Sequence, residues 1–363
     1  MKLFSCPACK SVVYFDNSQC TRCGRGLAYV AELATMTAVE PIDRVAGLFV
    51  ALAPEAKGGR FRLCGNQVDH AACNWAVAES DDHRFCRSCR LNEMIPNLSD
   101  STAKDQWLKL ERNKRRLIYS LLALGLPVEP RSEQPRGVAF SFKQDLPGTE
   151  KVLIGHDRGL ITINIAEADS PFREKTRVEL GESYRTLLGH FRHEIGHYYW
   201  DRLVRDSPAL EAFRRLFGDE RASYDDAVAV HYREGAPTDW RTRFVSSYAS
   251  MHPWEDWAES WAHYLHMVDT LDTARSFGLA VRSTVTSGSG ASKAEVVTRR
   301  LDFDDFDDLG RAWTPLTIAL NCLNQSMGLA DLYPFVLPEP ALRKIRFVHD
   351  LIESCASSTG APP

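Results

Sequence analysis

Two histidines and a glutamate at metal-site spacing are the most informative residues of this 363-residue chain. His193, Glu194 and His197 lie in the letters HEIGH, within a proline-free segment that predicts a helix over residues 183–204. Because four residues make about one helical turn, both histidines project from one face and can take two corners of a zinc tetrahedron. Glu194 lies about 100° around the helix, where its carboxylate can reach a metal-bound water without binding the metal. This spacing is typical of metal-assisted peptide hydrolysis.

The helix that carries these residues is predicted to be amphipathic. Its apolar side consists of Leu187, Leu188, Phe191, Ile195, Tyr198 and Tyr199. The other side carries the two motif histidines together with His190 and Trp200. His190 precedes the motif by nearly a turn, and we expect a structural role or a contact to a ligand from it. The competing interpretation is three histidines on a solvated helix face.

A zinc site that activates water needs a third protein ligand, and residues 253–267 (PWEDWAESWAHYLHM) are its best source. A proline at the start suits a first helical turn. The apolar stripe of this predicted helix consists of Trp254, Trp257, Trp261 and Leu265. Glu255 and Glu259 lie on the neighbouring stripe, so one can bind zinc while the other accepts the outer N–H of a ligating histidine. The alternative is an amphipathic helix with two exposed acids.

Eight of the ten cysteines fall within residues 1–89 and predict two further zinc sites. Two C-x2-C pairs separated by ten residues form a tetrathiolate zinc-ribbon signature at Cys6, Cys9, Cys20 and Cys23. A less regular second set consists of Cys64, Cys73, Cys86 and Cys89. His70 or His83 is an alternative to one of these four thiolates. We expect Cys322 to be a buried small side chain and Cys355 to be a free thiol.

Bulk composition is that of an ordinary globular protein. The chain is 44% hydrophobic and 25% charged, and its formal net charge of −4 provides no general attraction to nucleic acid. A basic helix predicted over residues 103–124 is interpreted as a solvated face rather than as a surface for nucleic acid or an acidic partner. Its basic residues are Lys104, Lys109, Arg112, Lys114, Arg115 and Arg116. With no recognisable secretory signal or membrane span, and with thiolate sites that suit a reducing compartment, a cytoplasmic location is expected.

The predicted fold class is α+β, in four parts. These are a zinc ribbon (1–30), a second four-cysteine region (31–100), a mostly helical domain with a small β-sheet (101–353) and a disordered tail (354–363). Strands are predicted at 138–143 and within 151–169, and they would form a sheet beside the HEIGH helix. Residues 281–296, which are rich in Ser, Gly and Thr, predict a mobile surface loop.

These segments together resemble a known family. HEIGH followed at long range by Tyr248, Glu255 and Glu259 resembles the gluzincin metallopeptidases. Over nearly its full length the chain resembles the bacterial zinc-binding metallopeptidases that carry an N-terminal zinc-ribbon region. This second resemblance includes the cysteine pairs and the segments 159–169 and 185–203. It implies a gluzincin-like domain after the zinc-ribbon region.

The resemblance also implies roles for individual residues. His193, His197 and Glu255 would bind one catalytic zinc, and Glu194 would be the general base. Glu259 would be the acid that contacts a ligating histidine. Tyr248 would be a hydrogen-bond donor to the transition state, although a packed aromatic residue fits the position equally well. The two cysteine sets would hold two structural zinc ions.

The substrate is not identified by these motifs, and the expected partner is a peptide or protein. Gluzincins bind extended substrates along an edge strand, for which Leu160–Ile165 is the best candidate, although a core strand fits the same letters. The zinc-ribbon region would be structural and would recognise a protein partner or gate the cleft. Two other classes stay open. One is a zinc-ribbon module that binds protein or nucleic acid and carries a vestigial peptidase domain, and the other is a hydrolase of non-peptide amides.

Overall fold

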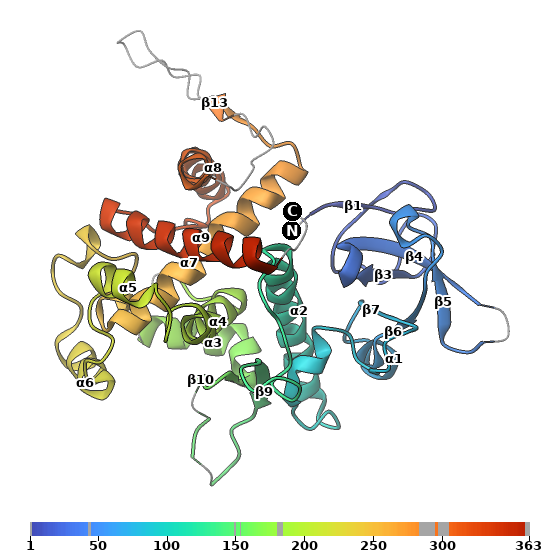
Figure 1. Cartoon of the computed structure of the whole chain (residues 1–363), viewed down its shortest axis with the longest axis horizontal. Coiled ribbons are helices and arrows are strands. Elements are labelled where there is room, and N and C mark those ends of the chain that lie inside the picture. The colour runs from blue at the N-terminus through green and yellow to red at the C-terminus, as the bar shows by residue number, and fades with distance from the viewer. Residues whose placement is uncertain are drawn as a thin grey trace. The chain divides into compact units, whose positions relative to one another are not determined.

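The structure is a computed structural model of the chain that describes residues 2–42, 45–148, 150–152, 154–179, 184–282, 295–296 and 305–359. Helices and strands both contribute to it, which confirms the α+β fold class. The chain divides into two compact units, Met1–Arg173 and Glu174–Pro362, which are described separately (Figure 1).

The first half of unit 1 contains a short hairpin and a five-stranded antiparallel sheet. The hairpin pairs β1 (Phe4–Ser5) with β2 (Val12–Val13). The sheet follows chain order through β3 (Leu27–Val30), β4 (Thr35–Pro41), β5 (Leu48–Ala51), β6 (Arg60–Leu63) and β7 (Ala76–Ala78). An isolated bridge joins Tyr29 in β3 to Trp75 beside β7, so the sheet curves back on itself.

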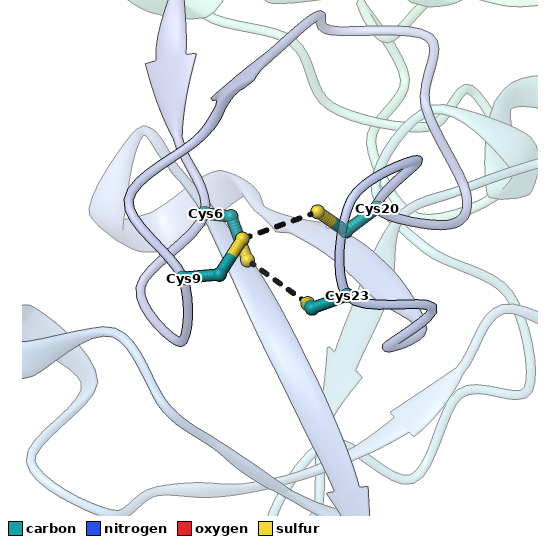
Figure 2. Close-up of side chains that lie close together, drawn as sticks. All are labelled: Cys6, Cys9, Cys20 and Cys23. Atoms are coloured by element: carbon teal, nitrogen blue, oxygen red, sulfur yellow. Dashed lines mark hydrogen bonds between the residues drawn. The ribbon is translucent and has the colours of Figure 1, made fainter.

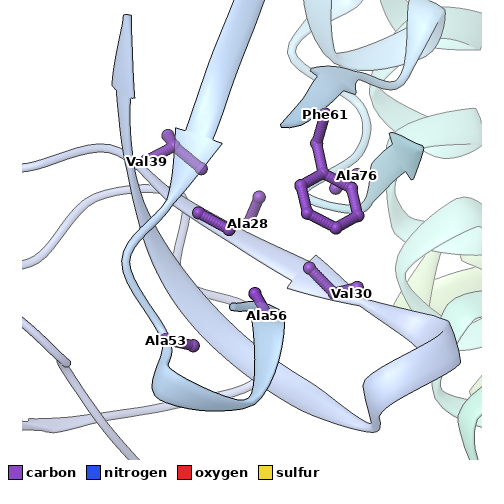
Figure 3. Close-up of a cluster of buried hydrophobic side chains, with 8 residues drawn as sticks. Ala28, Val30, Val39, Ala53, Ala56, Phe61 and Ala76 are labelled. Atoms are coloured by element: carbon purple, nitrogen blue, oxygen red, sulfur yellow. The ribbon is translucent and has the colours of Figure 1, made fainter. Parts of the chain in front are cut away.

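One aromatic ring and several small side chains fill the inside of this sheet (Figure 3). Ala28 and Val30 are two residues apart on β3 and therefore point to the same face. Phe61 on β6 lies in the same buried cluster and is its largest side chain. The remaining members are Val39, Ala51, Ala53, Ala56 and Ala76. This core holds the strands that flank both cysteine sets.

The second half of unit 1 pairs a long helix with a mixed sheet. The helix α2 (Ser101–Ala123) begins after Asp100, whose carboxylate accepts the backbone N–H groups of Thr102 and Ala103. The sheet has the order β10-β11-β9-β8. Its strands are β8 (Asn92–Met94), β9 (Ala139–Lys143), β10 (Gly155–Asp157) and β11 (Leu160–Asn164).

The assignment of Leu160–Ile165 to an edge strand is wrong. Strand β11 pairs with β10 on one side and with β9 on the other, so it is internal to the sheet. Its letters are apolar because Ile161 and Ile163 are buried beneath the sheet, which is the core-strand reading of the same pattern. Strand β10 occupies the edge instead. The sheet belongs to unit 1, whereas the HEIGH segment belongs to unit 2.

The basic helix spans Ser101–Ala123, close to the predicted 103–124, but it is not a solvated face. Lys114 and Arg115 are buried, because Lys114 pairs with the buried Glu111 at 2.9 Å and Arg115 donates to the carbonyl of Ala72. Arg112 and Arg116 both pair with Asp16, more than ninety positions earlier in the chain. These contacts satisfy charges that the sequence pattern alone assigns to solvent.

The division at Arg173 differs from the boundary that the sequence suggests near residue 100. Strand β8 precedes that boundary, yet it pairs with β9, which follows it. The side chain of Asn92 on β8 also donates to Glu111 of α2 at 2.7 Å. These contacts join residues 101–173 to the N-terminal cysteine regions in one compact unit.

Unit 2 is mainly helical, and α7 (Pro253–Ser276) lies at its centre. Helix α4 (Leu187–Leu203) packs along α7, and α8 (Phe306–Ser326) and α9 (Glu339–Thr359) contact it elsewhere. Lys344 of α9 reaches Asp256 at 2.5 Å, which ties α9 to the first turn of α7. The shorter helices are α3 (Ser170–Glu179), which crosses the division between the units, α5 (Leu210–Phe217) and α6 (Tyr224–Glu234).

Two local predictions are corrected in unit 2, and a third lies largely outside the described residues. Helix α9 continues through Thr359, so residues 354–359 are helical rather than disordered, and 360–363 lie outside the described residues. Cys322 is exposed rather than buried, because it lies on the outer side of α8, while Cys355 is half-buried. The predicted loop at 281–296 falls largely outside the described residues. Its described ends, β12 (Val281–Arg282) and β13 (Glu295–Val296), pair antiparallel.

No helix in the described ranges is long and apolar enough to cross a membrane.

Candidate metal centres

The HEIGH segment lies in α4, which begins after Thr186. The Thr186 hydroxyl accepts the backbone N–H of Gly189 at 3.0 Å and caps the helix. The helix therefore begins at Leu187, later than the predicted start at residue 183. The helix is buried on nearly all sides. Even Arg192 is only 6% exposed, and its charge is paired with Asp269. An amphipathic pattern therefore describes α4 less well than an internal helix does.

A glycine inside the motif allows α4 and α7 to approach closely. A Cβ atom at Gly196 would lie 3.1 Å from the Cα of Ala258 and 3.2 Å from the side chain of Trp261. The indole N–H of Trp257 donates to the carbonyl of Gly196 at 2.8 Å, which fixes the register of the two helices. This approach places Glu255 of α7 against the histidines of α4.

The two histidines and Glu255 converge on one point. The Nε2 atoms of His193 and His197 are 3.2 Å apart. Glu255 Oε2 is 3.0 Å from His193 Nε2, and Glu255 Oε1 is 3.5 Å from His197 Nε2. Ligands at about 2.05 Å from zinc in a tetrahedron are about 3.3 Å apart, so the separations of His193 Nε2 from His197 Nε2 and from Glu255 Oε2 fit a zinc ion. Glu255 Oε2 is buried and receives no hydrogen bond from any described residue outside the two histidines, as expected of an oxygen that would face a metal.

The charges of the three groups respond to one another. Burial lowers the pKa of His193, but the hydrogen bonds and charges of Glu255 and Glu259 outweigh it and raise the pKa well above its usual value. Burial raises the pKa of Glu255, and the neighbouring histidines outweigh it and hold the pKa well below the ordinary range. The pKa shifts therefore favour a protonated His193 beside an ionised Glu255, so a positive charge lies where a bound cation would otherwise neutralise the carboxylate.

Glu259 contacts His193, a candidate ligand, as its place one turn after Glu255 predicts. Its Oε1 lies 2.8 Å from His193 Nδ1, the ring nitrogen that points away from the cluster. Its Oε2 accepts the hydroxyl of Ser246 at 2.6 Å. Both oxygens are occupied, so Glu259 can orient the imidazole but has no oxygen left for a metal. The spacing of the motifs gave no indication of Ser246.

Glu194 is positioned to handle a proton. Its Oε1 is 3.4 Å from His190 Nε2, one helical turn earlier. Its Oε2 is buried and makes no hydrogen bond with a described residue. Burial raises the pKa of Glu194, but the hydrogen bond to His190 and the nearby histidine charges outweigh it, so the pKa lies below the ordinary value. An ionised carboxylate with one unengaged oxygen can accept a proton.

Tyr248 lies at the same cluster, in the short 3-10 turn Tyr248–Ser250. Its ring centroid is 5.9 Å from that of His193. Burial and the charge of Glu255 raise the pKa of Tyr248 above its usual value, so the phenol keeps its proton at neutral pH. A protonated phenol beside the ligands is a hydrogen-bond donor.

Two aromatic residues at this centre were not identified from the sequence. Tyr224, at the start of α6, donates its hydroxyl to Glu255 Oε1 at 2.9 Å. The ring of Trp254 lies against the ring of His197, with centroids 3.9 Å apart. Trp254 was visible only as part of an apolar stripe. Tyr224 precedes Glu255 by 31 positions and belongs to no motif, so no sequence signal could have indicated it.

The zinc-ribbon cysteines meet at a second centre, in unit 1 (Figure 2). Cys6 and Cys23 approach with 3.9 Å between their sulfurs, and Cys9 and Cys20 with 3.6 Å. A zinc tetrathiolate with bonds of about 2.3 Å has sulfurs about 3.8 Å apart, so these separations fit zinc. Hydrogen bonds from Ser11 lower the pKa of Cys9 to about 6, which favours the thiolate that a metal requires.

The second cysteine set forms a third centre from four buried thiols. Cys73 and Cys86 have sulfurs 3.7 Å apart, and Cys64 and Cys89 complete the cluster. Backbone N–H groups donate to two of these sulfurs, from Cys86 to Cys64 and from Trp75 to Cys73, at 3.4 Å each. Since four thiols already converge, neither His70 nor His83 is needed. His70 faces Trp107, and His83 lies 3.5 Å from Glu133.

Comparison with known proteins agrees with zinc chemistry at these centres. Residues 103–351 match the family model described as "Putative zinc-binding metallo-peptidase", and residues 3–100 match a zinc-ribbon domain. Uncharacterized proteins of Mycobacterium bovis and of the Mycobacterium tuberculosis strains CDC 1551 and H37Rv are each 40% identical over 358 residues, which cover 98% of this chain and 96% of each relative. No solved structure matches the chain significantly. The chain belongs to this family of zinc-binding metallo-peptidases and carries its zinc ribbon at the N-terminus.

Proposed function

We propose that this protein hydrolyses peptide bonds with a catalytic zinc held by His193, His197 and Glu255. The observation that carries the proposal is the convergence of these three ligands at zinc-compatible distances beside Glu194. Two helices, each carrying part of the set, would have no structural reason to bring two imidazoles and a buried carboxylate to one point without a cation.

Each residue of the cluster would contribute one step. Bound zinc would supply Lewis-acid chemistry that lowers the pKa of water to about 7. Glu194 would take the proton of the attacking water on Oε2, its unengaged oxygen, and return it to the leaving amine. Tyr248 would donate its phenolic proton in a hydrogen bond to the oxyanion that forms on the scissile carbonyl. Glu259 would keep His193 in the tautomer that presents Nε2 to the metal.

The two cysteine centres would each hold a structural zinc. We place the protein in the cytoplasm, since a reducing compartment preserves two sets of metal-binding thiolates. Its partner would be a peptide or protein substrate, and the zinc-ribbon region is a candidate surface for a protein partner. Nucleic acid is not an expected partner, because the net charge is −4 and the basic residues of α2 are largely paired or buried.

Glu194→Gln tests the proposal directly. Glutamine keeps the shape of the side chain but cannot accept the proton, so turnover should fall by about 10²–10⁴-fold while bound zinc stays unchanged. Peptide termini would be compared between cells that express the active protein and cells that express the variant, and the sites found would then be assayed with purified protein.

Glu211→Gln is the matched control, because Glu211 lies on the same unit with an exposed side chain. It should retain full activity. Normal turnover by Glu194→Gln on a verified substrate would refute the general-base assignment. Zinc-loaded protein that hydrolyses no peptide but cleaves other amides would identify a non-peptide amidohydrolase, and zinc-loaded protein without any hydrolysis would identify a vestigial domain.

A further inference from the structure

Helix α6 brings an additional tyrosine to the His/His/Glu cluster. Tyr224 is the first residue of α6, and the Ser223 hydroxyl accepts the backbone N–H of Asp226 to cap the helix. The Tyr224 hydroxyl donates to Glu255 Oε1 at 2.9 Å. Tyr224 and Tyr248 also lie close enough for each phenol to shift the pKa of the other. Tyr224 therefore donates to the proposed carboxylate ligand and lies near the proposed oxyanion donor.

The hydrogen bond from Tyr224 makes the two oxygens of Glu255 different. Oε1 is engaged by the phenol, whereas the buried Oε2 receives no hydrogen bond from any described residue outside the two histidines. Oε2 makes the closer approach to a histidine, at 3.0 Å from His193 Nε2 against 3.5 Å between Oε1 and His197 Nε2. The oxygen that the phenol does not engage is the one best placed to bind a cation.

We propose that Tyr224 is a positioning residue that makes Glu255 a one-oxygen ligand of the catalytic zinc. A carboxylate that binds through both oxygens would take the coordination position that a catalytic zinc leaves open for water. A phenol held on Oε1 competes with the metal for that oxygen and leaves Oε2 to it. The inference rests on zinc binding by this cluster, which is part of the proposed function, but it does not depend on peptide hydrolysis.

The surroundings of Tyr224 explain how its hydroxyl is kept in place. Its ring centroid is 5.4 Å from that of His252 and 6.0 Å from that of Trp254, which itself lies against His197. Helix α6 buries none of its side chains completely, so these ring contacts and the hydroxyl hold its start at the site. Phenylalanine at position 224 would keep the ring contacts and remove only the hydrogen bond.

The test compares Tyr224→Phe with Tyr232→Phe in the full-length protein. Tyr232 lies on the same helix and is 59% exposed, so the control removes a tyrosine hydroxyl from the surface of that helix. Zinc affinity of the exchangeable site is measured by competition with a chelator of known affinity. We expect Tyr224→Phe to lower it by roughly 10-fold or more, the usual effect of losing a hydrogen bond to a ligand, and Tyr232→Phe to leave it within about twofold.

Cobalt(II) in the exchangeable site gives a second readout that general destabilisation would not change in the same way. Four-coordinate cobalt absorbs visible light more strongly than five-coordinate cobalt, so Tyr224→Phe should weaken the absorption bands of this site. Glu255→Ala identifies those bands by their absence. Unchanged affinity with an unchanged cobalt spectrum would overturn the proposal, as would equal losses in both tyrosine variants. Tyr224-dependent zinc affinity in a protein that cleaves no peptide would support this proposal and contradict only the hydrolytic function.

Discussion

The two acids on α7 are distinguished by what their oxygens contact. Glu259 uses both oxygens, one on His193 Nδ1 and one on the Ser246 hydroxyl. Glu255 has one oxygen on Tyr224 and the other 3.0 Å from His193 Nε2. These contacts favour the proposed roles, in which Glu255 binds the metal and Glu259 orients the imidazole.

Glu255→Ala should therefore lose the exchangeable zinc, since two histidines alone hold it weakly. Glu259→Ala should keep the ion, but its zinc affinity or its activity should fall about 10–100-fold, as expected when a ligand loses its orienting contact. Metal analysis of both variants after gel filtration, followed by affinity measurement, checks this order. If Glu259→Ala is the variant that empties the site, the two roles must be exchanged.

How far sequence predicts such a site depends on whether its residues share an element. His193, Glu194 and His197 are placed by helical periodicity alone, and Glu255 and Glu259 follow from the same rule on a second helix. Tyr224 and Ser246 reach the site only through the folding of intervening segments. No spacing rule relates them to the motif, so only the structure brings them in.

At the scale of elements, the site depends on the close approach of α4 and α7 at Gly196. A Cβ there would lie 3.1 Å from backbone and 3.2 Å from Trp261, so the helices would have to separate by a few tenths of an ångström. The ligands come from both helices, and a shift of that size would pull Glu255 away from the histidines.

Gly196→Ala should weaken zinc binding, although alanine favours a helix by about 1 kcal/mol over glycine. Gly310→Ala is the matched control, because Gly310 lies within α8 and a Cβ there meets no atom within 4 Å. The control should raise the melting temperature and leave zinc affinity unchanged. Equal stabilisation by both substitutions, with normal zinc binding in each, would show that the close approach does not matter.

A buried histidine farther along α7 should make stability depend on pH. His263 is 7% exposed, its Nδ1 is 2.6 Å from the Tyr333 hydroxyl, and burial lowers its pKa to about 4. The unfolded chain binds a proton near pH 6.5 and the folded chain only near pH 4, so stability is full above pH 6.5 and falls as the pH drops toward 4. Between pH 7 and pH 5 the titration of His263 should lower the free energy of unfolding by about 2 kcal/mol.

His263→Asn removes that titration, so the free energy of unfolding should change less between pH 7 and pH 5 than in the unmodified protein. Urea unfolding followed by tryptophan fluorescence measures both slopes. A slope in His263→Asn equal to that of the unmodified protein would contradict the assignment.

Helices and strands were predicted well where a regular apolar pattern defines them. They were predicted less well where contacts with neighbouring elements determine strand position or side-chain burial. The helices around residues 101–123, 187–203 and 253–276 followed from periodicity, because a regular apolar pattern needs no knowledge of the partner. The place of β11 did not follow, since an apolar strand reads alike at the edge and in the interior of a sheet. The burial of Lys114 likewise depends on Glu111 and Asn92, whose positions only the fold determines.

At the scale of the molecule, three metal centres are distributed over two compact units. Both cysteine centres lie in unit 1, and the His/His/Glu centre lies in unit 2. The sequence indicated three centres from ligand spacing. It did not indicate that residues 101–173 fold with the cysteine regions, because the pairing of β8 with β9 crosses the apparent boundary near residue 100.

The intact protein should bind three zinc ions of two kinds. In the cysteine centres four thiolates would enclose the metal, and all four sulfurs of the second set are buried, so release should need acid or a thiol reagent. The His/His/Glu centre offers three ligands and an open position, from which metal exchanges more readily. Mild chelation should thus remove about one zinc per chain and all activity, while circular dichroism shows the fold retained. Elemental analysis before and after chelation gives the counts. A single zinc in the intact protein, with the eight N-terminal cysteines reacting freely with a thiol reagent under native conditions, would show that unit 1 holds no metal.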